Sequence, residues 1–168
     1  MKKLLTFFLT ALLAFSVGWA ETTGFSLAAT TTVPIAANSS SGTITGQNET
    51  WNVNIQGSLT SSSMQGKTGA RYWQMGKAGS SITSATFSTT GISGTITSIV
   101  VNCASATSAG GSVSVTVGGS SFGNSSNLPQ WSNNAGGDIT FSGSSSGEVI
   151  VTIVPQSGKA CYIQSITV

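Results

Sequence analysis

The sequence predicts an all-β protein, folded as a single antiparallel β-sandwich of roughly eight to ten strands. Apolar and polar residues alternate with a period of two along several segments, and turn signals separate these segments at intervals of about 8 to 12 residues. After the first 20 residues, no window of about 11 residues carries the 3.6-residue apolar stripe of a helix. Short strands joined by regular turns are typical of sandwiches and barrels.

Three segments show the clearest alternation and are predicted to be half-buried strands: residues 51–56, 112–117 and 138–141. Two runs, 99–101 and 149–154, are apolar on both faces and predict strands in the middle of a sheet that is covered on each side. Weaker strand patterns complete the set: residues 24–29, 41–46, 71–75, 82–89 and 161–168.

Glycine and serine clusters mark the connections. Gly118 and Gly119 predict a two-residue hairpin, because glycine adopts the positive φ angles of primed turns at little cost. Residues 57–69 and 122–137 lack a strand pattern and are predicted to be long loops. Binding residues concentrate on loops of this kind, which a rigid scaffold positions.

The N-terminus has the pattern of a secretory signal peptide. Lys2 and Lys3 precede an apolar run over residues 4–17, and Ala20 ends a small-x-small cleavage site. The run is shorter than the roughly 20 residues that cross a bilayer, so we expect no membrane anchor in the mature chain. The sequence therefore predicts residues 1–20 as a cleaved leader and residues 21–168 as one domain, secreted to the periplasm or the outside.

Without the leader, the charged side chains cancel. Four basic residues remain, Lys67, Arg71, Lys77 and Lys159, against four acidic ones, Glu21, Glu49, Asp138 and Glu148. A domain without a basic patch has nothing to neutralise phosphates, so nucleic acid is not an expected partner. Only 6% of residues are charged, so the polar surface consists mainly of Ser, Thr, Asn, Gln and Gly.

Cys103 and Cys161 are the only cysteines. Export to an oxidising compartment allows a disulfide between them. The alternative is two separately buried thiols that pack as small apolar groups. The sequence leaves both open, because it does not show the distance between the two Cα atoms.

The chain has no histidine, which excludes Ser-His-Asp and Cys-His catalysis and histidine-based metal sites. Acid–base chemistry would fall to Glu49, Asp138 and Glu148. Each lies beside a turn or strand edge, where we expect a solvated charge, although a carboxylate-pair glycosidase stays an alternative. The protein is therefore predicted not to be an enzyme and to use no metal or cofactor.

Tryptophan and tyrosine rings can stack on sugars, or they can pack in the core. Trp51 alternates with apolar residues and Trp73 with Met75, so both are predicted to lie in the core. The same alternation turns Tyr72 and Gln74 outward.

Trp131 differs from these two tryptophans. It lies in a segment without alternation, close to Asn133 and Asn134. This composition fits a loop that stacks on a sugar ring and hydrogen-bonds to its hydroxyls, while a tryptophan folded back onto the sandwich is the alternative. Trp131, Asn133 and Asn134, with Tyr72 and Gln74, form the predicted ligand-binding set.

Several strand segments carry a resemblance to a known group. The runs RYWQMG at 71–76, SATFST at 84–89, TITSIVVN at 95–102 and ACYIQSITV at 160–168 resemble a family of secreted β-sandwich modules from gut bacteria. The resemblance covers residues 45–168. It implies a jelly-roll-like sandwich, similar in architecture to carbohydrate-binding modules, and carries over no site residue.

Neutral charge, amide-rich loops, export and this resemblance together favour a non-catalytic binding module with a glycan as its ligand. The alternative is a structural or adhesive surface protein that acts through exposed sheet edges or self-association. The sequence does not fix the oligomeric state.

Overall fold

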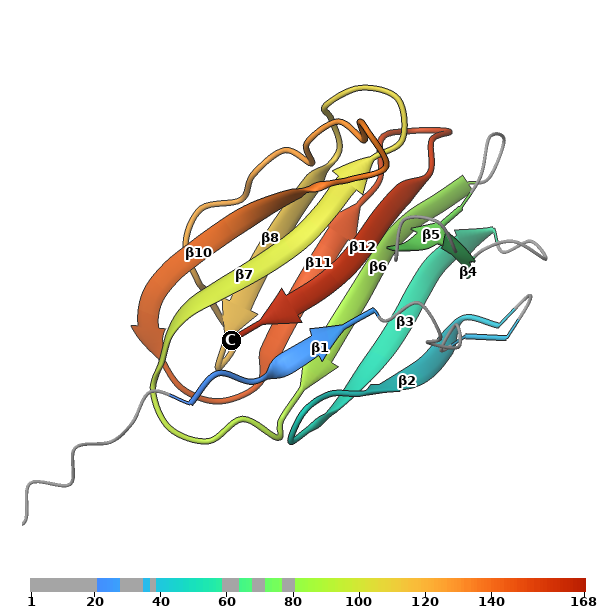
Figure 1. The fold of residues 1–168 in the computed structure, drawn as a ribbon. Coiled ribbons are helices and arrows are strands. Elements are labelled where there is room, and N and C mark those ends of the chain that lie inside the picture. The colour runs from blue at the N-terminus through green and yellow to red at the C-terminus, as the bar shows by residue number, and fades with distance from the viewer. Residues whose placement is uncertain (1–20, 28–34, 37–38, 59–63, 68–71, 77–80) are drawn as a thin grey trace, which may run out of the picture.

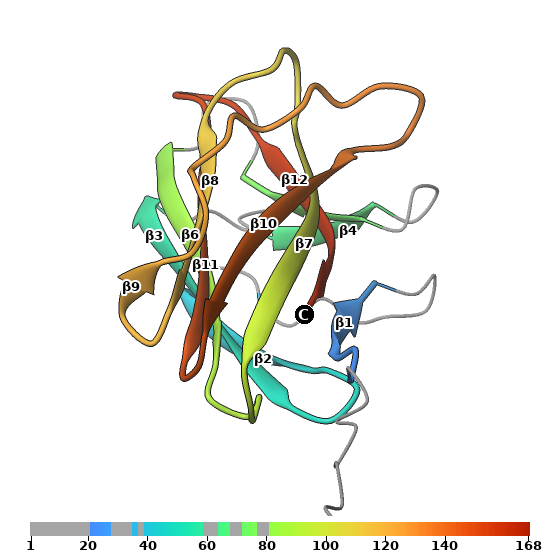
Figure 2. The ribbon, with the colours of Figure 1, turned by 90° about the vertical axis from the view of Figure 1, so that its left-hand side faces the viewer.

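Two antiparallel sheets pack face to face in this protein, as Figure 1 shows from the front and Figure 2 from the side. The computed structural model describes residues 21–27, 35–36, 39–58, 64–67, 72–76 and 81–168. The predicted leader over residues 1–20 lies outside the described residues. In the described ranges, no helix is long and apolar enough to cross a membrane.

The strands follow the predicted segments closely. In chain order they are β1 (Gly24–Ser26), β2 (Ser41–Thr45), β3 (Thr50–Ser58), β4 (Met64–Lys67), β5 (Tyr72–Met75), β6 (Ser81–Thr89), β7 (Ile96–Ser105), β8 (Ser112–Val117), β9 (Ser120–Ser121), β10 (Gly137–Ser145), β11 (Val149–Val154) and β12 (Cys161–Thr167). The first sheet, called sheet A, has the order β10-β7-β12-β5-β4, and β1 also pairs with β12. The second, called sheet B, has the order β2-β3-β6-β11-β8-β9. All of these strand pairings are antiparallel, which confirms the predicted sandwich.

The core lies between the two sheets and holds the residues that alternation assigned to it. Trp51 and Trp73 are both buried, as predicted. Phe25 of β1 joins them, with its ring centroid 5.5 Å from Trp51 and 5.7 Å from Trp73. Removing such a side chain from water stabilises the fold by about 3 kcal/mol, so even the three-residue strand β1 contributes to the core.

One prediction about the core is wrong. Strand β11 lies in the middle of sheet B but is not covered on both faces, because Ile150 is partly exposed and Val154 is 40% exposed. An antiparallel sheet can keep one face in water, and the apolar run of β11 extends onto that face. Residues 99–101 in β7 are likewise covered on one face only, because Val100 is half-buried.

Two short strands were missed, which raises the number of described strands above the predicted eight to ten. Strand β4 falls in the predicted loop 57–69, and β3 extends into the same segment as far as Ser58. Both short strands carry little side-chain signal and are defined by backbone pairing, β4 with β5 and β9 with β8. The hairpin between β8 and β9 is confirmed, since Gly118 and Gly119 have φ angles of 59° and 81°.

Candidate functional site

The segment before β10 lies along the end of β7 and then over the outer face of sheet A. The Ser105 amide donates to the carbonyl of Pro129 at 2.7 Å, and the Trp131 amide donates to the carbonyl of Ser105 at 2.8 Å. Leu128 is fully buried and anchors the segment from below. The predicted long loop is therefore fixed against the end of β7 at Trp131.

Trp131 packs against two tyrosines from neighbouring strands. Its ring centroid lies 4.3 Å from that of Tyr162 in β12, at an interplanar angle of 33°, and 4.6 Å from that of Tyr72 in β5, at 89°. We call these three residues the aromatic cluster. Trp131 is half-buried on the outer face of sheet A, so it has features of both predicted alternatives: it folds back onto the sandwich yet keeps part of its ring in solvent.

The prediction that Tyr72 and Gln74 point into solvent is wrong. Both lie on the outer face of sheet A, as the alternation required, but they are only 3% and 6% exposed. Trp131 covers Tyr72, and the Gln74 amide donates to the carbonyl of Gly76 at 2.8 Å. Alternation predicts the face of a strand, but it does not reveal a loop that returns to cover that face.

A polar network holds the cluster from the side. The Tyr72 hydroxyl accepts a hydrogen bond from the Gly136 amide at 2.9 Å and donates to the side-chain oxygen of Asn102. The Asn102 amide in turn donates to the Asp138 carboxylate at 2.5 Å. Burial raises the pKa of Tyr72, and the nearby charge of Asp138 adds to that effect while the bond from Gly136 opposes it.

Asn133 and Asn134 form the exposed tip of the same segment. Their φ angles of 51° and 59° are those of a type I′ turn, which asparagine tolerates better than most residues. Two backbone hydrogen bonds close this turn, at 3.1 and 2.9 Å between Ser132 and Ala135. The side chains of Asn133 and Asn134 remain in solvent, two and three residues beyond Trp131.

The structure thus splits the predicted ligand-binding set. Trp131, Asn133 and Asn134 reach solvent, whereas Tyr72 and Gln74 support the site from below. Sequence reasoning missed Tyr162 and Asn102 as members of this region and treated Asp138 only as an isolated charge. The strand register brings Asn102 opposite Asp138, and no local pattern carries that information.

Replacing Tyr72 by phenylalanine is expected to lower the free energy of unfolding by about 1.5 kcal/mol, because the Gly136 amide and the Asn102 oxygen lose their partner. Amide exchange at Gly136 should accelerate as the segment loosens, which hydrogen-exchange NMR measures. Tyr162→Phe is the matched control, since no hydrogen bond of its hydroxyl is found within the described residues. An unchanged exchange rate at Gly136 in Tyr72→Phe would contradict the anchoring role.

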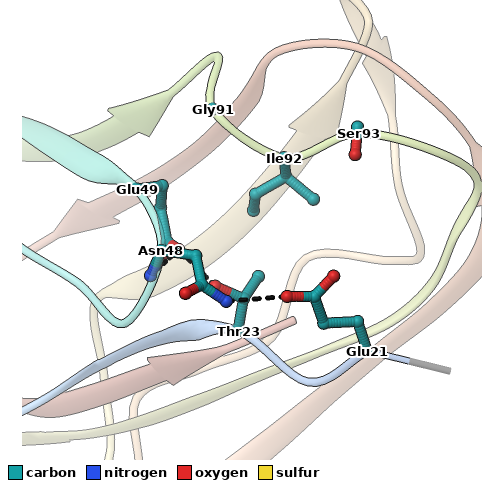
Figure 3. A pocket seen from close by; sticks show the side chains of 7 residues that line it. All are labelled: Glu21, Thr23, Asn48, Glu49, Gly91, Ile92 and Ser93. Atoms are coloured by element: carbon teal, nitrogen blue, oxygen red, sulfur yellow. Dashed lines mark hydrogen bonds between the residues drawn. The ribbon is translucent and has the colours of Figure 1, made fainter.

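A small pocket lies at the turn between β2 and β3, where the N-terminal segment passes (Figure 3). Its volume is about 150 Å³, below the roughly 300 Å³ at which drug-sized ligand sites begin. Glu21 and Glu49 both line it, and Asn48 donates to the Glu21 carboxylate at 2.7 Å. Two of the described carboxylates therefore line the same pocket.

The prediction of a solvated charge is wrong for Glu49, which is only 7% exposed. One carboxylate oxygen accepts from the Trp51 indole at 2.7 Å. The other accepts from the Thr23 hydroxyl and from the Asn48 amide, the latter at 3.1 Å. With three donors on two oxygens, Glu49 serves as a fixed acceptor that ties the N-terminal segment to the core.

Both cysteines are free, buried thiols, the second of the two predicted arrangements. They lie on adjacent strands, but Cys103 faces Ile163 and Cys161 faces Ser105, so the two are diagonal neighbours. Diagonal neighbours are roughly 7 to 8 Å apart, beyond the usual reach of a disulfide. Burial raises the pKa of Cys103 from 9.0 to about 12, with the charge of Asp138 as a second cause. Burial also raises the pKa of Cys161.

At pH 8 the folded protein is expected to leave both thiols unmodified by a maleimide, because only the thiolate reacts readily. Unfolding in guanidinium should expose two reactive thiols, counted by mass spectrometry. Unfolded thiols ionise near pH 9 and the folded Cys103 near 12, so stability is full below pH 9 and falls as the pH rises through this window. A native mass lower by two hydrogen atoms would reveal a disulfide and contradict this prediction.

Within the described residues, no group of three or more Asp, Glu, Cys or His side chains is placed to hold a metal ion. No family model, no curated protein and no solved structure matches this chain. The site therefore has to be interpreted from its own geometry.

Proposed function

We propose that this protein is a non-catalytic glycan-binding module whose contact surface is the aromatic cluster. The observation that carries the proposal is the half-buried ring of Trp131, which two tyrosines hold in a fixed orientation. The indole packs on Tyr162 and Tyr72, and the residue keeps part of its surface in solvent. A preordered ring of this kind offers a stacking surface whose own ordering adds little entropic cost to binding.

The groups around Trp131 suit a sugar. A pyranose ring presents C–H groups on its faces and hydroxyls at its rim, and it needs an apolar surface flanked by planar hydrogen-bonding groups. Asn133 and Asn134 supply exposed amides, and Asp138 supplies an exposed carboxylate. The negative charge of Asp138 favours a neutral sugar over an anionic one.

We further propose that the protein acts outside the cytoplasm. The support is the leader pattern of residues 2–20, together with a domain whose side-chain charges cancel. Mass spectrometry of the exported protein tests this proposal, since cleavage after Ala20 would leave Glu21 as the first residue.

The test of glycan binding is an array screen followed by calorimetry on any ligand found. Trp131→Ala should weaken binding at least tenfold, whereas Trp131→Phe should retain part of the affinity because it keeps an aromatic face. Val154→Ala is the control, since Val154 is an exposed apolar residue on the other sheet. An array without ligands, or wild-type affinity in Trp131→Ala, would overturn the proposal.

A further inference from the structure

Strand β2 forms one edge of sheet B (Figure 1). We infer that β2 is a dimerisation edge, where a second copy of the chain pairs with it as an antiparallel strand. Sheets normally protect their edges with charges, bulges or very short strands. Among the other described edge strands, β10 has a register shift, β4 has four residues including a lysine, β1 has three residues and β9 has two. By contrast, β2 is five residues long, pairs regularly with β3, and contains no charge and no proline.

The hydrogen bonds at either end of β2 define which backbone groups point outward. The Ile55 amide donates to the carbonyl of Ser40 at 2.7 Å, just before the strand. The Gly46 amide donates to the carbonyl of Glu49 at 2.8 Å, just after it. Both bonds follow the register of β2 and β3. Hydrogen-bonded and non-hydrogen-bonded pairs alternate in an antiparallel ladder, so these two bonds fix the pattern between them.

Gly42 and Ile44 therefore direct their backbone groups toward β3. Ser41, Thr43 and Thr45 direct theirs away from it, toward the edge of the sheet. The side chains of these three residues are exposed. Among the described residues, these outward backbone groups have no hydrogen-bond partner, so the edge presents three consecutive positions for another strand.

The sequence of β2 is complementary to itself in the antiparallel direction. With Thr43 opposite Thr43 of the second copy, Ser41 lies opposite Thr45, and the outward groups of β2 form three hydrogen-bonded pairs of residues. In the same register Gly42 lies opposite Ile44 on the core side, so a residue without a side chain meets the largest one. This pairing is isologous and closes as a dimer.

Electrostatics does not oppose the association of two copies. The six Lys and Arg residues include Lys2 and Lys3 of the leader, so four remain in residues 21–168 against four Asp and Glu. A net charge near zero promotes association. The contact is short, so we expect a weak dimer that forms at high protein concentration. The dimer is independent of the proposed glycan binding.

Sedimentation equilibrium over a wide concentration range tests the dimer. The wild-type protein should show a monomer–dimer equilibrium, and Thr43→Lys should be monomeric, because it places two like charges opposite each other at the two-fold axis. Ser121→Lys is the matched control, with the same charge change on an exposed residue of β9 at the other edge of sheet B, and should dimerise like the wild type.

A cysteine variant tests the register directly and does not depend on the folding of Thr43→Lys. Two residues of a hydrogen-bonded antiparallel pair have Cα atoms about 5.5 Å apart, within disulfide range. Thr43→Cys should therefore give a disulfide-linked dimer under mild oxidation, while Ser121→Cys should not. A wild-type protein that stays monomeric at every concentration, Thr43→Lys that associates like the wild type, or assemblies larger than a dimer would each overturn the inference.

Discussion

Replacing Glu49 by alanine is expected to lower the free energy of unfolding by about 4 kcal/mol, because buried hydrogen-bond donors lose their acceptor. The Trp51 indole is fully buried, and its N–H loses its acceptor once the carboxylate is gone. The Thr23 hydroxyl loses its partner as well. Each buried donor left unpaired costs about 1 to 3 kcal/mol.

Urea unfolding followed by far-UV circular dichroism measures this loss. Glu148→Ala is the matched control, because Glu148 is an exposed glutamate at the turn between β10 and β11 and its removal should change stability by less than about 0.5 kcal/mol. Glu49→Gln should be intermediate, since the amide keeps one acceptor oxygen. Equal urea midpoints for Glu49→Ala and Glu148→Ala would show that the carboxylate is not structural.

The second large effect is expected for Gly24→Ala, with a loss of about 3 kcal/mol or more. Gly24 has a φ angle of 132°, and a Cβ atom there would lie 2.0 Å from the carbonyl oxygen of Ile166. The backbone of β1 must then move away from β12, which withdraws Phe25 from its contacts with Trp51 and Trp73. The cost combines backbone strain with lost aromatic burial.

The variant Gly158→Ala separates backbone strain from the loss of aromatic burial. Gly158 also has a positive φ angle, 67°, but a Cβ atom there would meet nothing within 4 Å. This control should cost about 1 kcal/mol, the strain of the positive φ angle alone. Thermal unfolding of the two variants side by side gives the difference. If both melt at the same temperature, the close approach to Ile166 is not what requires glycine at position 24.

The fold could be predicted because its signal is local. Period-two alternation in β3, β8 and β10 identified the strands and the core face from neighbouring residues alone. The same pattern contained a clue to Glu49: position 49 continues the alternation of Trp51 and Val53, which places the glutamate on the core side. Its polarity obscured this, and the buried carboxylate was expected to lie in solvent.

The candidate site could be predicted only in part, because it depends on contacts that are distant in sequence. Trp131 was identified from the composition of its loop. Its packing against Tyr72 and Tyr162 depends on where that loop returns to sheet A, and the link from Tyr72 to Asn102 depends on the sheet pairing. Strand patterns do not encode these juxtapositions.

The pairing of the first and last described segments determines where the aromatic cluster lies relative to a point of attachment. Thr23 and Val168 exchange two backbone hydrogen bonds, at 3.0 and 2.8 Å, so the first and last described segments meet at one end of sheet A (Figure 1). Tyr162 lies at the start of β12 and Val168 just beyond its end, so the aromatic cluster is at the far end of the same strand. A linker, a carrier domain or a sensor surface joined next to Thr23 or Val168 would therefore lie at the opposite end of β12 from the aromatic cluster.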